Sequence, residues 1–510
     1  MPGFMYLLLS VTTLLLGYYF YSRLVEKVFR PDENRRPPAL SMTDGVDYIP
    51  EPPRRVLLNQ FLCIAGTGPV FGPILGILYG PSALLWIVLG SIFGGAVHDY
   101  LSGMMAMRYR GESIPNIAGY LYGPVFKQFM RLFSLFLLIV VGAIMAMAPA
   151  ELLSSMTRPE LNDKLFWLII IFTYYFFATI MPIELLLDRF NPFFTCIMAA
   201  MAVLVVVALI FGDYPLFQMA AHPAPHPNNL PLWPLMFITI ACGAISGFHA
   251  TQSTISARCL ANEKMGRQIF YGAMIMESVI ALIWATAGMT LYQTSAGLQE
   301  ILNNGGPARV VRDICFEVLG EFGGLLAVLG VIILPVTSGD TAFRSARLLV
   351  ADIFNFTQKN IPRRILIAVP LFAAGIYISL SDDFSRVWRY FAWLNQSLAC
   401  FVLWSGAAYL VRIRRCHWVA TIPAVFMTAV VTTYILYEKI GLGLPYDLSV
   451  LIGLGAALAG LGFFLVQRDR ILNRAPYELT PTGEWVANDP RESVEPGTDA
   501  CSPPEGAERI

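Results

Sequence analysis

The sequence predicts an all-α integral membrane protein with about 13 transmembrane helices, and three observations support this fold class. Of the 510 residues, 56% are hydrophobic and only 14% are charged, which is too apolar for a soluble chain of this length. Apolar segments of roughly 20 residues, the length that crosses a bilayer, recur along the chain. Two of these segments carry glycine-rich clusters at their centres, which predicts interrupted helices.

The composition also excludes several classes of function. The formal net charge is zero, which argues against nucleic acid as a partner. The eight cysteines are scattered without a CxxC pair or other metal-ligand spacing, so we interpret them as small core residues and predict no metal and no cofactor. The sequence contains no Ser-His-Asp pattern, phosphate-binding loop or zinc motif, and no soluble domain for ATP hydrolysis. We therefore expect no enzymatic activity.

The first apolar segment, 4–21, is predicted to be a retained anchor because its basic residues follow it. The other expected spans lie near 61–80, 83–107, 130–150, 165–181, 193–212, 233–256, 269–291, 323–337, 364–380, 388–411, 419–438 and 447–467. The chain then divides into an anchor and cytoplasmic linker (1–57), two five-helix units (58–212 and 233–411), two peripheral helices (412–470) and a disordered cytoplasmic tail (471–510).

Basic residues indicate the orientation of these spans. With the loop after the first span placed in the cytoplasm, most Lys and Arg residues fall on the cytoplasmic side, as the positive-inside rule requires. The N-terminus is then expected outside and the C-terminus inside.

The two glycine-rich clusters lie in the second and seventh predicted spans. The first contains Gly66, Thr67, Gly68 and Pro69, and the second occupies 242–249. A break inside hydrocarbon leaves backbone polar groups that protein, water or a solute must satisfy. Because the spans are five apart, they cross the membrane in opposite directions. This predicts the inverted five-helix repeat of LeuT/APC-like transporters.

The broken helices suggest a substrate class. Free N–H groups at a half-helix N-terminus suit a carboxylate, and free carbonyls at the opposing end suit a cation or an ammonium group. We therefore predict a zwitterion or small carboxylate as substrate. The alternative is that the glycines only permit close helix contact. The predicted substrate-binding residues are Gly66, Thr67, Gly68, Pro69, Gly243, Ser246, Gly247 and His249.

A polar group at the end of the ninth span predicts the coupling site. In inverted-repeat symporters, a Thr-Ser pair here helps to bind the coupling sodium, and a carboxylate beside it can carry a proton. The alternative is an N-cap for the next helix, with Asp340 paired to Arg344. The predicted coupling residues are Thr337, Ser338, Asp340 and Thr341, with the further intramembrane residues His98, Asp99 and Glu277.

Several long segments resemble the carbon starvation protein A family of bacterial inner-membrane transporters. They include AGTGPVFGPILG at 65–76, GAVHDY at 95–100, CGAISGFHA at 242–250, YGAMIMES at 271–278 and PVTSGDTAFRSARLLVAD at 335–352. The resemblance implies import of a small peptide or, in a subgroup, a carboxylate such as pyruvate. It also implies symport with a proton rather than sodium, across the bacterial inner membrane.

The chain departs from the family pattern at three places. Asp44 stands where familiar members have Asn, His98 stands where they have Gln, and the third place lies just before the first break. Familiar members carry a His-His pair where this chain has Asn59 and Gln60, which removes one candidate for proton handling. A gated channel for small solutes and a membrane-embedded nutrient sensor remain as alternatives. The expected partners are the substrate and the lipid bilayer, and the sequence leaves a homo-oligomer open.

Overall fold

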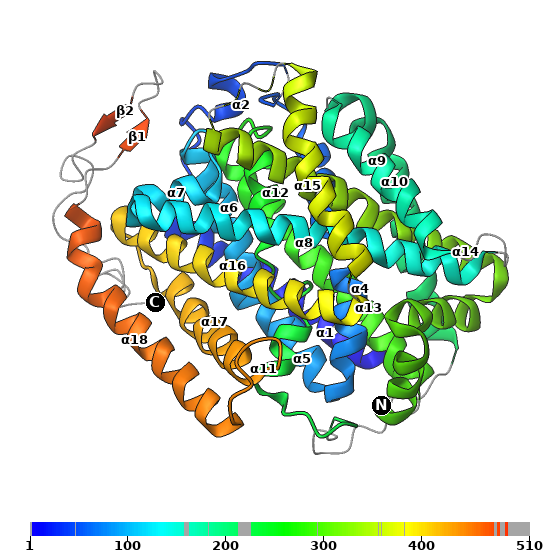
Figure 1. The fold of residues 1–510 in the computed structure, drawn as a ribbon. Coiled ribbons are helices and arrows are strands. Elements are labelled where there is room, and N and C mark those ends of the chain that lie inside the picture. Colours follow the sequence, from blue (N-terminus) through cyan, green and yellow to red (C-terminus); the bar gives the residue numbers. More distant parts are fainter. Residues whose placement is uncertain are drawn as a thin grey trace, which may run out of the picture.

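The computed structural model describes residues 3–45, 47–157, 163–181, 183–212, 226–292, 294–354, 356, 358, 360–381, 383–473, 477–479 and 485–487. These residues form an all-helical fold (Figure 1), apart from one antiparallel pair of short strands, β1 (Tyr477–Leu479) and β2 (Trp485–Ala487). The predicted all-α membrane class is confirmed. Within the described part of the chain, ten helices are long and apolar enough to cross a membrane, or eleven if one bent pair forms a single span.

The count of 13 spans and the five-helix repeat stay predictions. The helices other than the two broken ones have the following bounds: α1 Gly3–Phe29, α2 Pro38–Ser41, α5 Ser82–Gly90, η2 Ser91–Gly95, α6 Ala96–Arg108, α7 Ile114–Tyr122, α8 Pro124–Met156, α9 Lys164–Ile180, α10 Ile183–Phe211, η4 Glu263–Met265, η5 Arg267–Tyr271, α13 Gly272–Leu291, α14 Ser295–Phe354, α15 Ile361–Ser381, α16 Phe384–Arg412, α17 Trp418–Tyr437 and α18 Tyr446–Asn473.

The second predicted span is interrupted in the structure at the predicted place. It consists of α3 (Pro53–Ile64), then α4 (Gly68–Gly76) and the short η1 (Ile77–Tyr79), with a bend of 47° between the two parts. Pro69 lies in the first turn of α4, where a helix needs no backbone N–H from that residue.

The seventh predicted span is interrupted as well. Its parts are α11 (Leu232–Thr239) and α12 (Phe248–Ala257), and residues 240–247 between them are not helical. Gly243 has a φ of +88°, a conformation that side chains other than glycine rarely adopt. The glycine-rich segment therefore lets the chain turn where a continuous helix would otherwise run.

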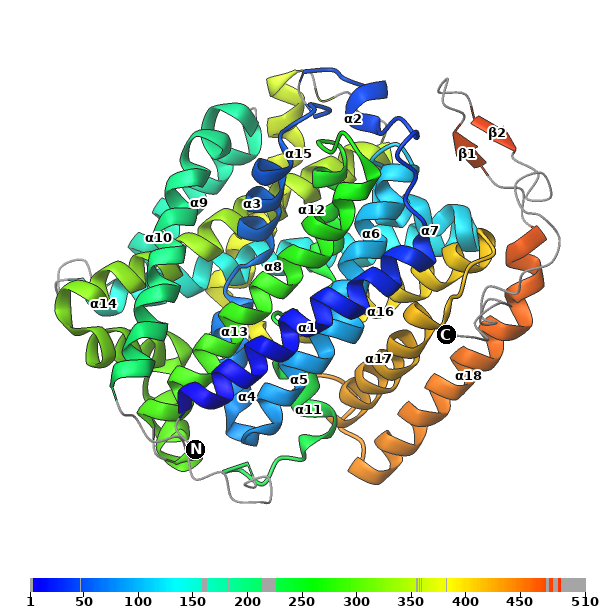
Figure 2. The ribbon, with the colours of Figure 1, turned by 180° about the vertical axis from the view of Figure 1, so that it is seen from behind.

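The two broken spans run in opposite directions. Figure 2 shows α3 and α12 toward the end of the molecule that holds α2, and α4 and α11 toward the opposite end; Figure 1 shows the same for α12, α4 and α11. The first span therefore leads away from the α2 end and the second returns to it. Which end faces the cytoplasm stays a prediction.

Burial separates central helices from peripheral ones. In their most apolar stretches, 89% of residues are buried in α16 and in the span containing α13, against 11% in α1 and 22% in α18. Figure 1 shows α18 along one edge, beside α17. α13 and α16 therefore form the centre on which the broken helices pack. Most of the tail that was predicted to be disordered lies outside the described residues.

Two helical regions lie between predicted spans. α7 connects α6 and α8, and α14 begins well before the predicted span at 323–337. α14 is not continuous in geometry, since Gly305, Gly306 and Gly320 have non-helical backbone angles. Its last part carries the predicted coupling residues past α3 and α8.

Candidate transport site

The two breaks are in direct contact. A Cβ atom on Gly68 would overlap the side chain of Cys242, and a Cβ on Gly66 would lie 2.7 Å from Met145 Cε and 3.1 Å from Ser338 Oγ. A Cβ on Gly247 would meet the backbone of Asn395 on α16. Close helix contact thus accounts for these three glycines. Their contact with a substrate stays a prediction.

Asn395 covers the N-terminus of α12. Its Oδ1 accepts a hydrogen bond from Phe248 N at 2.8 Å, and its backbone oxygen accepts one from Gly247 N at 3.2 Å. Its Nδ2 donates to Ser246 Oγ at 3.0 Å. The amides that the sequence predicts for a substrate carboxylate are therefore hydrogen-bonded to α16 in this structure. Asn395 was not among the predicted site residues, although an amide inside an apolar span signals an interhelical contact.

Thr337 and Ser338 lie against the first break. Ser338 Oγ donates to the carbonyl of Cys63 at 3.0 Å. Thr337 Oγ1 lies 3.2 Å from the carbonyl of Leu62 and 2.9 Å from that of Leu334 on its own helix. The last carbonyls of a helix lack intrahelical partners, and these two hydroxyls satisfy part of that need at the end of α3. The predicted Thr-Ser pair and the first break thus share one polar interface.

Asp340 is fully buried on α14, about one helical turn after Thr337. Tyr174 donates its hydroxyl to Asp340 Oδ2 at 3.2 Å, and Thr341 Oγ1 lies 3.2 Å from Oδ1. α14 continues through these residues, so the alternative that they cap a new helix is wrong. Arg344 donates from Nη2 to the carbonyl of Ala178 at 2.5 Å, and its pairing with Asp340 stays a prediction.

A second set of ionisable residues meets beside the second break. Asp99 Oδ1 lies 2.7 Å from His98 Nδ1, and Asp99 Oδ2 lies 2.9 Å from His249 Nδ1. The other ring nitrogen of His249, Nε2, lies 3.3 Å from Glu277 Oε2. All four side chains are fully buried. The structure therefore joins residues that the sequence suggested separately, with His249 linking the two carboxylates.

The same corner holds a set of side chains that fits a metal ion. The ligand atoms of Cys242, His249 and Glu277 all lie within 4.8 Å of one another. Sequence spacing could not reveal this group, because its members come from the second break, the start of α12 and the middle of α13.

Gln60 stands where the family resemblance places a histidine. It is buried between α3 and α12, accepts a hydrogen bond from Ser256 Oγ at 2.7 Å and donates to Ser253 Oγ at 3.2 Å. The amide thus joins the α3 half of one broken span to the α12 half of the other.

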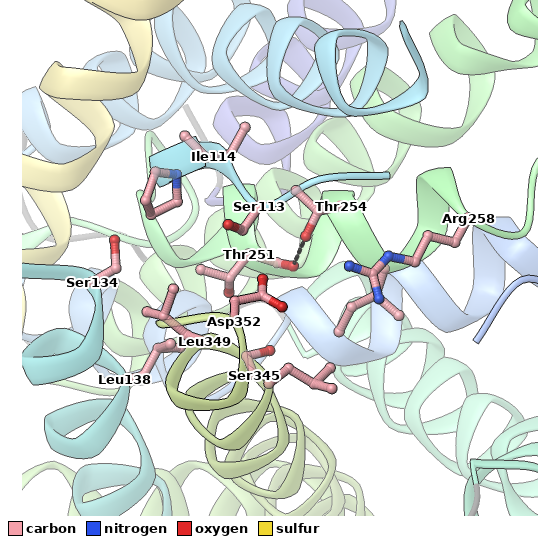
Figure 3. A pocket seen from close by; sticks show the side chains of 13 residues that line it. Ser113, Ile114, Ser134, Leu138, Thr251, Thr254, Arg258, Ser345, Leu349 and Asp352 are labelled. Carbon is pink, nitrogen blue, oxygen red and sulfur yellow. Dashed lines mark hydrogen bonds between the residues drawn. The ribbon is translucent and has the colours of Figure 1, made fainter. Parts of the chain in front are cut away.

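A small polar pocket lies farther along α12. Figure 3 shows Asp352 from α14 beside Thr251 and Thr254 from α12, with Arg258 nearer the end of that helix. Thr254 Oγ1 donates to the carbonyl of Thr251 at 2.7 Å, and Arg258 Nε donates to the carbonyl of Gly111 at 2.9 Å. Because Thr251 follows His249 by two residues, the pocket begins close to the second break. No sequence motif marks it.

Solved structures share this architecture. The chain matches MhsT in complex with L-phenylalanine with a TM-score of 0.52 and 14% identity, covering 81% of this chain and 98% of that one. It matches a manganese transporter from Eremococcus coleocola with a TM-score of 0.53 and 12% identity, covering 84% and 99%. At these identities the likeness shows the fold alone, which is the LeuT-like fold that the sequence predicted.

Sequence relatives are closer. An uncharacterized membrane protein of Haemophilus influenzae is 38% identical over 349 residues, which is 58% of this chain and 93% of that protein. A protein named peptide transporter CstA from Campylobacter jejuni is 27% identical over 86% of this chain and 80% of its own length. Another protein of that name, from Bacillus subtilis, is 26% identical over 82% of this chain and 87% of its own length.

These relatives and the apolar helices together show a multi-pass membrane protein. The sequence profile described as carbon starvation protein CstA matches residues 2–161 and 155–303, more than half of the chain. The chain therefore belongs to the CstA family, as the motifs around both helix breaks predicted.

Proposed function

We propose that this protein is a secondary active transporter that imports small peptides across the bacterial inner membrane by symport with a proton. The observation that carries the proposal is the contact between two oppositely directed broken helices, with buried polar residues of α14 against one of them. The names of the relatives supply the substrate class. The protein is not an enzyme.

The substrate site is assigned to the contact between the two breaks. When α14 and α16 move away, the end of α3 would offer its carbonyls to an ammonium group, and the start of α12 would offer its amides to a carboxylate. A peptide has both groups at its termini, so it fits this pair of helix ends better than a simple cation or anion does. A small carboxylate such as pyruvate would use only the α12 end.

The coupling proton is assigned to Asp340. A fully buried carboxylate in a membrane helix must be neutralised or paired. Asp340 accepts hydrogen bonds from two hydroxyls, and the buried Arg344 one turn along α14 acts on it electrostatically without a direct ion pair among the described residues. Asp340 lies two residues from Ser338, which is hydrogen-bonded to the end of α3. Protonation of Asp340 can therefore influence the first break through α14. Roles for His98, Asp99 and Glu277 in coupling stay predictions from the sequence.

The polar pocket of Figure 3 is assigned to the path between the site and the cytoplasm. It lies along the half-helix that leads from the second break toward the α2 end. Positive-inside counting places that end in the cytoplasm. Import requires the substrate to leave the protein on this side. Threonine, serine and aspartate side chains can bind water along such an exit path.

Transport by purified protein in liposomes tests the proposal. With an inward proton gradient, wild-type protein should accumulate a labelled dipeptide above its external concentration, and Asp340→Asn should abolish accumulation while the protein stays folded. Asp313→Asn is the matched control on the same helix, because Asp313 lies 3.7 Å from Arg309 in a partly exposed pair.

The outcomes separate the alternatives. Accumulation driven by a sodium gradient alone would show sodium coupling. The coupling site would then be assigned to the carbonyls and hydroxyls around Thr337 and Ser338. Flux without accumulation would support a channel, and accumulation of pyruvate but not dipeptide would change the substrate. Wild-type coupling in Asp340→Asn would remove Asp340 from the mechanism.

A further inference from the structure

Glu277 lacks the partners that a buried carboxylate needs. It is fully buried in α13, and within the described residues neither of its oxygens accepts a hydrogen bond of good geometry, although the backbone N–H of Gly243 approaches it. The near side chain is His249, whose Nε2 lies 3.3 Å away and also makes no hydrogen bond in the described part of the chain. Leaving such groups unpaired is costly in a low-dielectric interior. A positive charge at this place, either a proton on His249 or a bound metal ion, would neutralise the carboxylate.

A thiol completes this arrangement. Cys242 Sγ belongs to the second break, is buried, and lies within 4.8 Å of the ligand atoms of His249 and Glu277. Because residues 240–247 are not helical, Cys242 can approach α12 and α13 at once. Ligands of a tetrahedral metal lie about 2.0–2.3 Å from the ion, so modest movements would bring all three atoms to an ion at their centre.

Asp99 orients the histidine for such a role. It lies 2.9 Å from His249 Nδ1, and a proton on Nδ1 leaves the lone pair of Nε2 directed toward Glu277. A carboxylate that holds the far nitrogen of a metal-binding histidine is a recurrent feature of metal sites. Asp99 would therefore be a positioning residue and not a ligand.

We propose that Cys242, His249 and Glu277 bind a divalent transition-metal ion of the Zn²⁺ class at the second helix break. A thiolate, a neutral imidazole and a carboxylate together carry two negative charges, which such an ion neutralises. The soft sulfur ligand disfavours Mg²⁺ and Ca²⁺. Three protein ligands leave a fourth position open to water or a solute. The proposal departs from our interpretation of the cysteines as core residues only.

Cobalt provides a direct test, because a Co²⁺ ion bound by a thiolate has a sulfur-to-metal charge-transfer band. The full chain, purified in detergent and treated with a chelator, should develop this band on titration with Co²⁺. Zn²⁺ should abolish the band, and desalted protein should retain one zinc per chain. Cys242→Ser should lose the band. Cys400→Ser is the matched control, because Cys400 is equally buried and contacts Thr428 on α17.

Two further variants keep the test decisive if Cys242→Ser does not fold. Glu277→Gln removes a ligand, and Asp99→Asn should weaken Zn²⁺ binding by about 10–100-fold, as loss of a residue that orients a metal ligand does. No thiolate band and no retained zinc in the wild-type protein would overturn the proposal and leave a proton as the cation at Glu277. A band that persists in Cys242→Ser would also overturn it. Neither result decides whether the protein transports peptides, because dipeptide accumulation tests transport separately.

Discussion

Glu263 and Glu277 are both buried acidic residues near α13, but their surroundings differ. Glu263 accepts hydrogen bonds from Arg108 Nη2 at 3.1 Å, from Arg108 Nε at 3.2 Å and from the backbone N–H of Asp32 at 2.9 Å. Glu277 has no arginine or lysine partner among the ion pairs of the described residues, and His249 Nε2 lies 3.3 Å from it without a hydrogen bond of good geometry. The comparison separates a charge that is neutralised by the fold from one that is left available for a cation.

The Glu263 cluster connects several parts of the chain. Arg108, at the end of α6, also donates to the hydroxyl of Tyr409 on α16 at 3.0 Å and to the carbonyl of Arg30 at 2.9 Å. Its guanidinium lies over the ring of Phe29. The cluster therefore holds α1, the linker, α6 and α16 together at the α2 end, away from the two breaks.

The largest expected effect is on stability at Glu263. Arg108→Ala removes the hydrogen-bonded partner of a buried carboxylate and leaves only the more exposed Arg35, 3.6 Å away, among its ion pairs within the described residues. It should lower the free energy of unfolding by about 3–5 kcal/mol. Denaturant unfolding in detergent measures the change. Arg309→Ala removes a more exposed pair with Asp313 and should change the same quantity by about 1 kcal/mol or less. Equal losses in the two variants would remove the distinction between buried and exposed pairs.

A smaller loss is expected at Asn395, which hydrogen-bonds the second break. Asn395→Ala leaves the N–H of Phe248 without its 2.8 Å acceptor, and an unsatisfied buried amide lowers stability by about 1–3 kcal/mol. The same unfolding assay applies. Asn303→Ala is the control, since Asn303 is exposed and contacts only Gln299 among the hydrogen bonds described. No loss at Asn395 would mean that water replaces the side chain.

The smallest effect is expected at Glu277. In chelator-treated protein, Glu277→Gln removes an acid that has no hydrogen bond of good geometry to another side chain and keeps the volume of the side chain, so the free energy of unfolding should change by about 1 kcal/mol or less. Glu263→Gln is the direct comparison, and it should destabilise the protein by about 3–5 kcal/mol because Arg108 stays buried without a carboxylate. Similar losses in both variants would contradict the contrast between the two sites.

The interrupted helices were predictable because glycine and proline inside an apolar segment have a direct backbone consequence. In the structure, one helix is interrupted between Ile64 and Gly68 and another between Thr239 and Phe248. Both interruptions lie within the segments that the sequence indicated. α7 and the start of α14 were not predicted, because polar and glycine-rich sequence between spans carries no hydrophobic signal of membrane length. Their helical form depends on packing against the bundle.

The arrangement of the buried side chains was less predictable. The sequence indicated Asp99, His249 and Glu277 individually, since ionisable residues are rare inside membrane spans. It could not show that His249 lies between the two carboxylates, because that contact joins α6, α12 and α13. The same limit applies to Cys242, whose place in a ligand set depends on the path of the chain through the second break.

The contact of Asn395 with the second break has a consequence for the transport cycle. The acceptor lies on α16 and the two amides lie at the start of α12, so a shift of one helix past the other separates them. The exposed N–H groups would then be open to the terminal carboxylate of an arriving peptide. Asparagine and cargo would compete for one anion-binding position, and loading would be linked to helix movement without any additional gate.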